Sequence, residues 1–306
     1  MNPESTVALA AFLEATVRVA TPLALAAVGE TVTQRSGVIN IGLEGAMLVG
    51  ALTGTVAGIA AGSPWIGLAG AAVAGLIVGW LFAIVTVRGR GDQIVVGTAF
   101  TLGAIGLTGA WYRAAFGATG AALSVPAFTP VEVPLLSSIP VIGRALFAQP
   151  APTYLLYAVV PAIWIVVMRT QPGLALRATG ESPEAAAAAG INVSGTRTAA
   201  TMFGAMMGGV AGAVLVLAQA GTFAERMTAG RGFIAIAIVV LGRWHPLGVA
   251  AAALLFGAAS AMQYAFQAAG VSVPYQIVLM LPYVVTLLAL AGVGGRARAP
   301  AALGRA

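Results

Sequence analysis

The chain of 306 residues is 59% hydrophobic and only 8% charged, whereas soluble globular domains carry roughly 25% charged residues. Its net charge of +6 comes from arginine alone, because the sequence contains no lysine; it also has no cysteine and a single histidine, His245. This inventory excludes a phosphate-loop or Schiff-base lysine, a disulfide, a thiol nucleophile and a histidine or thiolate metal cluster. It implies no cofactor and no bound metal.

Several apolar runs approach or exceed the ~20 residues that cross a bilayer, so the sequence predicts an all-α fold, a polytopic integral membrane helical bundle. We treat residues 1–306 as one transmembrane domain and expect about nine transmembrane helices, within a range of about eight to ten. The helices predicted in chain order are Val7–Val28, Gly37–Ala61, Trp65–Val87, Asp92–Phe116, Thr153–Met168, Thr198–Ala220, Phe233–Leu241, Leu247–Ala268 and Gln276–Val293.

Two long loops separate these segments. Residues 117–152 contain six prolines and are expected to form an irregular extracytoplasmic loop. Residues 169–197 are polar and rich in alanine, and we expect them to be cytoplasmic. Within this second loop the pattern predicts a short capped helix, which an ordinary surface helix or a helix that docks a cytoplasmic partner would both explain. The residues concerned are Ser182, Pro183, Glu184, Ala186, Ala187 and Gly190.

The arginines are scattered in short loops, which argues against nucleic-acid binding and allows the chain to be oriented by the positive-inside rule. With loop 169–197 inside, alternating crossings place ten arginines in the cytoplasm and four outside, so the N-terminus is expected outside and the C-terminus in the cytoplasm. The inside set is Arg35, Arg88, Arg90, Arg169, Arg177, Arg197, Arg243, Arg296, Arg298 and Arg305, and the outside set is Arg113, Arg144, Arg226 and Arg231.

The apolar segment Phe233–Leu241 is too short to span a membrane alone, which predicts a broken or short helix near residues 226–242. Gly37–Gly45 and Gly232–Gly242 are both glycine-bounded apolar stretches that follow a polar turn. Their similarity is compatible with an inverted repeat of the kind found in transporters.

Small residues, mostly glycine, recur every four residues along the second, third and sixth predicted helices. Small residues at this spacing allow helix backbones to approach closely in lipid, so we interpret these positions as packing sites. The set includes Gly50, Gly54, Gly58 and Gly208.

Polar residues inside the apolar spans are candidates for a substrate pathway, because ionisable groups in a membrane usually face a cavity or pair with one another. Asn40 and Glu44 are expected on one face of the second helix, near its cytoplasmic start. There Glu44 would brace the bundle, form part of an inner gate, or carry a proton in a secondary carrier. Trp111 is either an interfacial aromatic residue or a stacking surface. Three further candidates, which interhelical hydrogen bonds would also explain, are Gln263, Tyr264 and Gln267.

Three stretches together resemble the permease subunits of bacterial ABC importers for branched-chain amino acids, ribose and nucleosides. They are GVINIGLEGAMLVGA, GLALRATGESPEAAAAAGINV and AGRGFIAIAIVVLGRWHPLG. The wording N-I-G-L-E-G is closest to the nucleoside, or simple-sugar, branch, and the resemblance extends from about residue 15 to about residue 295.

The resemblance implies a subunit of the bacterial inner membrane that translocates a small molecule and catalyses no reaction. Its implied partners are cytoplasmic ATPase subunits that bind the helix near residues 183–189, a second and different permease chain, an extracytoplasmic substrate-binding lipoprotein and membrane lipids. The alternatives left open are a ribose or branched-chain amino acid permease and a proton-coupled secondary carrier. An intramembrane enzyme lacks a convincing nucleophile and base.

Overall fold

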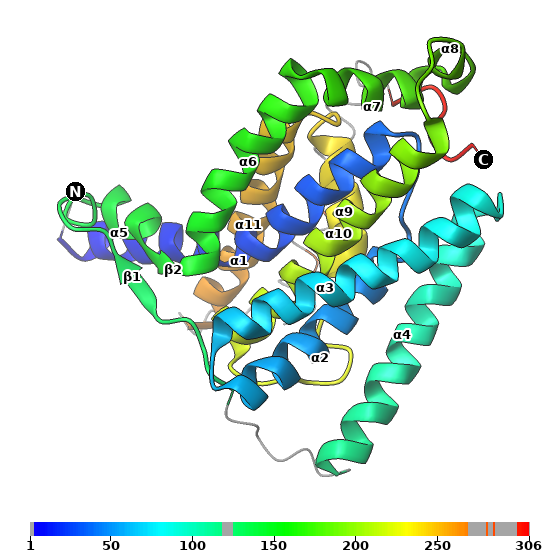
Figure 1. Ribbon diagram of the computed structural model, residues 1–306. Helices are drawn as coiled ribbons and strands as arrows, with labels where there is room; N and C mark the ends of the chain where they lie inside the picture. The colour runs from blue at the N-terminus through cyan, green and yellow to red at the C-terminus, as the bar shows by residue number, and fades with distance from the viewer. Residues whose placement is uncertain (1–2, 118–124, 269–279, 281–283, 285–298, 306) are drawn as a thin grey trace.

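The computed structural model describes residues 3–117, 125–268 and 299–305, together with the single positions Met280 and Val284. Helices dominate this part of the chain (Figure 1). Their bounds are α1 Pro3–Arg35, α2 Leu43–Ala61, α3 Pro64–Ala83, η1 Ile84–Arg88, α4 Gln93–Phe116, α5 Ile142–Phe147, α6 Ala151–Arg169, α7 Gln171–Glu181, α8 Pro183–Ala188, α9 Val193–Leu215, η2 Val216–Ala220, α10 Arg231–Leu241 and α11 Pro246–Ala268; the strands are β1 Pro130–Glu132 and β2 Ala148–Pro150.

Helix α9 lies at the centre of the molecule and packs against α1, α2 and α3 (Figure 1). Most of its length is buried, and its small residues allow the neighbouring backbones to approach closely. A Cβ atom added at Gly50 of α2 would collide with the backbone of Gly209. One added at Gly208 would lie 2.6 Å from a methyl group of Leu43. The bundle is therefore held together by contacts that no larger side chain could share.

The other predicted packing glycines differ in how tightly they are enclosed. A Cβ at Gly54 would lie 2.8 Å from the Cβ of Ala213, whereas one at Gly58 would meet its nearest atom, on Leu217, at 3.6 Å. The second distance is an ordinary van der Waals contact, so the stripe loosens toward the end of α2.

Six helices in the described part of the chain are long and apolar enough to cross a membrane, and α10 and α11 contribute two shorter apolar helices. These spans support a multi-pass helical membrane protein. The expected count of about nine stays a prediction, since the predicted helix Gln276–Val293 lies almost wholly outside the described residues. The broken or short helix expected near residues 226–242 corresponds to α10, which has 11 residues.

The region between the first two spans differs from the sequence prediction. The sequence predicts that the first helix ends at Val28 and that residues 30–36 form a polar turn, which is wrong because α1 remains helical to Arg35. The second helix was predicted from Gly37, yet α2 begins at Leu43 and residues 38–40 have no helical conformation. Side-chain acceptors replace the missing helical carbonyls there: the backbone N–H of Ile39 donates to Gln93 and that of Asn40 donates to Glu30.

The two long loops are more ordered than expected. Residues 117–152 contain a two-stranded antiparallel sheet, in which Pro130 faces Pro150, and the short helix α5. This lobe lies beside the N-terminal part of α1 (Figure 1). Residues 169–197 contain two helices, α7 and α8, and also the first turn of α9, which begins at Val193 and not at Thr198. Helix α8 and the C-terminus lie at the same end of the molecule (Figure 1).

We predict that Gly50→Ala lowers the stability of the bundle by about 1–3 kcal/mol, because the added methyl group overpacks the contact with Gly209. The matched control is Gly103→Ala on α4, where nothing lies within 4 Å of the added Cβ. The measurement is the midpoint of thermal unfolding of both variants in detergent. Equal midpoints for the two variants would contradict the packing interpretation.

Candidate functional site

The carboxylate of Glu44 lies at the N-terminus of α10, where it accepts three hydrogen bonds. The hydroxyl of Thr228 donates to Oε1 at 2.6 Å and the backbone N–H of Gly230 donates to the same oxygen at 2.8 Å. The backbone N–H of Gly232 donates to Oε2 at 2.6 Å. Glu44 is only 6% exposed. Both carboxylate oxygens are therefore held by donors from one short segment that is distant in sequence.

The local sequence around α10 makes this contact geometrically possible. Gly230 has a φ of +83°, a backbone conformation that residues other than glycine rarely adopt. A Cβ at Gly232 would lie 2.5 Å from the backbone nitrogen of Glu44. These two glycines allow the turn before α10 and the first residues of α10 to pack directly against the first turn of α2. The motifs G-L-E-G and A-G-R-G-F therefore form one contact.

The position of the carboxylate is electrostatically favourable. The first N–H groups of a helix have no partner within the helix, and its N-terminus carries a partial positive charge. A buried carboxylate needs several donors to offset its loss of water. Glu44 and the start of α10 therefore satisfy each other in an interior where neither would otherwise have water to bind.

The other end of α10 is also fixed by side chains of α1. The indole N–H of Trp244 donates to the side-chain oxygen of Gln34 at 2.7 Å, and the Nε of Arg35 donates to the Trp244 carbonyl at 2.8 Å. Since α10 has 11 residues, Glu44 lies about 16 Å along the helix from this corner. Glu44 lies in the first turn of α2, at the start of its helix as expected, and the cytoplasmic position of that start stays a prediction.

Asn40 does not share a helix face with Glu44, because it lies in the non-helical segment before α2. Its backbone N–H donates to Oε1 of Glu30 at 3.1 Å, and the side-chain amide of Gln34 donates to the same oxygen at 3.0 Å. The Oδ1 atom of Asn40 and the Oε2 atom of Glu30 are buried without a hydrogen-bond partner among the described residues.

Glu30 is a functional candidate that the sequence interpretation missed. It is fully buried, and its Oε1 accepts hydrogen bonds from Gln34 on the same helix and from the backbone N–H of Asn40, which links α1 to the segment before α2. The available signal was the spacing of Glu30 and Gln34, four residues apart and therefore on one helix face. Assigning residues 30–36 to a polar turn concealed this signal.

Of the remaining pathway candidates, Trp111 has a side chain within the described part of the structure. Trp111 is 41% exposed and packs edge-on against Phe116, while its neighbour Tyr112 is buried against Phe223. The aromatic residue that faces the protein interior is thus Tyr112. Gln263, Tyr264 and Gln267 belong to α11, but their side chains lie outside the described part of the structure.

Helix α8 has the caps that the sequence predicts. The hydroxyl of Ser182 accepts a hydrogen bond from the N–H of Ala185 at 3.4 Å, Pro183 occupies the first turn, and Gly190 has a φ of +82°. Of the two alanines proposed to contact a partner, Ala186 is buried at 3% exposure whereas Ala187 is exposed. Of these two alanines Ala187 is therefore the one available for docking, beside the exposed Ser182, Glu184 and Gly190.

Comparison with known proteins identifies the class of this fold. Residues 12–290 match the family model described as the branched-chain amino acid transport system / permease component. The chain belongs to this permease family.

Curated relatives of the permease align over most of its length. The guanosine ABC transporter permease protein NupQ of Bacillus subtilis (strain 168) is 36% identical over 97% of this chain and 96% of its own. The nucleoside ABC transporter permease protein NupC of Lactococcus lactis subsp. cremoris (strain MG1363) is 36% identical over 93% and 92%. The putative glucose ABC transporter permease protein TsgC13 of Haloferax volcanii is 36% identical over 83% and 77%. No solved structure matches the permease.

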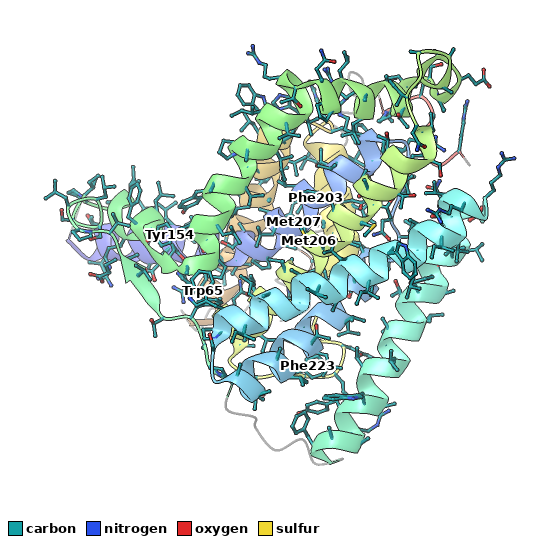
Figure 2. All side chains as sticks on the ribbon, in the orientation of Figure 1. Trp65, Tyr154, Phe203, Met206, Met207 and Phe223 are labelled. Atoms are coloured by element: carbon teal, nitrogen blue, oxygen red, sulfur yellow. The ribbon has the colours of Figure 1, made fainter. Side chains whose placement is uncertain are left out.

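A large apolar groove of about 720 Å³ lies between α6, α7 and α9 of the permease. Phe203, Met206 and Met207 line it together from the central helix α9 (Figure 2). Neither Glu44 nor Asn40 contributes to the groove. Its apolar wall offers few hydrogen-bonding groups to a polar solute, so the polar site at α10 and this groove are separate features.

We predict that Glu44→Gln lowers the stability of the permease by about 1–3 kcal/mol, because an amide nitrogen replaces one oxygen acceptor and faces the N–H or O–H donors around it. Glu132→Gln on the exposed strand β1 is the matched control. The measurement is the midpoint of thermal unfolding of both variants in detergent, followed by the fluorescence change of buried aromatic side chains as they become exposed. A Glu44→Gln midpoint equal to that of the control would show that the carboxylate is not a bracing group.

Proposed function

We propose that this permease is the membrane-spanning subunit of an ATP-driven importer that moves nucleosides, or related simple sugars, into the cell. The observation that carries the proposal is the likeness to a guanosine permease, which is 36% identical over 97% of the chain. A nucleoside permease and a putative glucose permease, each also 36% identical, support the same pair of substrate classes.

The energy for transport enters through a separate ATPase subunit. The sequence has no lysine and so lacks the residue that a phosphate-binding loop places on ATP. Helix α8 is the docking element that we propose for this subunit. It has only 6 residues and is therefore too short to be stable without packing, yet its caps and the buried Ala186 fix it with Glu184 and Ala187 outward.

The same proposal assigns the remaining partners and the orientation. A second, related but different permease chain completes the pathway, and an extracytoplasmic substrate-binding lipoprotein delivers the solute. The subunit lies in the bacterial inner membrane with α8 in the cytoplasm, the N-terminus outside and the C-terminus inside. The excess of arginine in the loops assigned to the cytoplasm supports this orientation.

Within the permease, we assign Glu44 to bracing or gating and not to direct substrate binding. All three of its hydrogen bonds are made to the protein itself, and the residue is 6% exposed. A proton-coupled carrier that uses Glu44 as its proton site would need to break this arrangement in every cycle. The bracing role requires only that the three bonds persist while α2 and α10 move as one body.

The proposed function predicts ATP-driven uptake of guanosine by the permease assembled with its ATPase, second permease chain and binding protein in lipid vesicles. The measurement is radiolabelled guanosine retained in the vesicles with and without ATP, with glucose and a branched-chain amino acid as competing solutes. Uptake by the permease alone, driven by a proton gradient, would refute the importer and favour the secondary carrier.

Docking through α8 predicts that Ala187→Arg prevents co-purification of the ATPase and abolishes uptake, because a long charged side chain replaces a methyl group on the exposed face. Ala114→Arg, an exposed position near the opposite end of the molecule on α4, is the matched control. Ala186→Arg would not serve, since that side chain is buried and the variant would disturb the fold. Normal co-purification with Ala187→Arg would exclude α8 as the docking element.

A further inference from the structure

The C-terminal segment 300–305 lies at the end of the molecule that carries α8 (Figure 1), and backbone hydrogen bonds hold it there. The N–H of Ala302 donates to the Gly180 carbonyl at 2.9 Å, and the N–H of Gly304 donates to the Gly37 carbonyl at 3.0 Å. The N–H of Ala301 donates to the carboxylate of Glu181 at 3.3 Å. The segment thus joins the last turn of α7 to the start of the non-helical stretch before α2.

Arg197 of α9 connects the same two regions through its side chain. Its Nε donates to the carbonyl of Ser36 at 3.2 Å, and one terminal nitrogen donates to the carbonyl of Arg305 at 3.2 Å. The residue is 6% exposed, and its second terminal nitrogen is buried beside Gly37 without a partner among the described residues. The planar guanidinium can donate to two carbonyls at once, which the single charged point of a lysine cannot do with the same geometry.

The contact between the C-terminal segment, the end of α7 and the end of α1 is closely packed. Ala302 is 5% exposed and Leu303 packs against the hydrophobic core. A Cβ at Gly180 would collide with the carbonyl of Arg35, so α7 passes directly against the end of α1. The neighbouring Ala301 is exposed. Adjacent alanines of one segment therefore occupy opposite environments.

The junction lies between two functional elements of the permease. On one side Gly180 is followed after three residues by Pro183, the first residue of α8. On the other side Gly37 leads through Asn40 to Glu44, whose carboxylate holds the start of α10. Close-packed contacts transmit a shift between discrete arrangements instead of absorbing it.

We propose that the C-terminal segment 300–305 and Arg197 form a coupling joint that transfers displacement of α7 and α8 to the segment before α2, and through Glu44 to α10. The proposal rests on the proposed function, in which an ATPase moves α8. Arg197 acts here as a positioning residue, since its side chain donates hydrogen bonds to carbonyl groups of the joint. The joint requires its hydrogen bonds to persist while ATP is hydrolysed.

The test measures guanosine molecules transported per ATP hydrolysed by the complete importer in lipid vesicles. Ala302→Arg displaces the buried side chain, and Ala301→Arg places the same side chain on the exposed neighbour as the control. We expect Ala302→Arg to retain the ATPase and its basal hydrolysis while transport per ATP falls at least about fivefold, in the range of typical coupling free energies. Ala301→Arg is expected to match the wild type.

Arg197→Lys is the second variant, because it keeps the positive charge but removes the planar guanidinium that donates to the two carbonyl groups at once. A fall in transport per ATP with normal assembly supports the joint, and an unchanged ratio in this variant overturns it even if Ala302→Arg fails to assemble. An unchanged ratio in Ala302→Arg also overturns the proposal. Absence of ATP-driven uptake in the wild type would instead refute the proposed function on which the joint depends.

Discussion

The contact between the carboxylate of Glu44 and the start of α10 is the interaction on which the interior of this permease depends. It places a group that is costly to bury against three donors that would otherwise lack partners. Neither half is stable in an apolar environment without the other. The start of α10 at Arg231 follows, because a helix continuing back through Thr228 would use these N–H groups internally and leave none for the carboxylate.

The same logic explains why polar residues gather at the two ends of α10 and not in the apolar groove. At the far end, Gln34 and Arg35 bind the indole and carbonyl groups of Trp244, and Glu30 orients Gln34. Helix α10 is thus fixed by side chains at both termini, although it is too short to cross a bilayer alone. A displacement of α1 or of the segment before α2 must therefore carry α10 with it, since slippage would expose unpaired polar groups to the apolar interior.

Sequence patterns predicted what depends on local rules and missed what depends on distant contacts. The apolar runs identified the spans, and Ser182, Pro183 and Gly190 defined α8 because capping is decided within a few residues. Asn40 was assigned to a helix because its surroundings are apolar and glycine-rich. What keeps it out of the helix is the buried bond from its N–H to Glu30, a residue on a different helix. The exposure of Ala187 and the burial of Ala186 were likewise hidden, since a run of five alanines carries no hydrophobic pattern.

Glycine residues set the distances between the central helices. Gly50 and Gly212 allow α2 and α9 to approach until their backbones touch, and Gly232 allows α10 to reach the backbone of Glu44. Each contact excludes any Cβ atom, so the spacing between helices is set by main-chain atoms whose positions cannot relax individually. A bundle built this way moves as rigid pieces. The groove beside α6, α7 and α9 differs from these contacts, because flexible side chains such as Met206 and Phe203 line it.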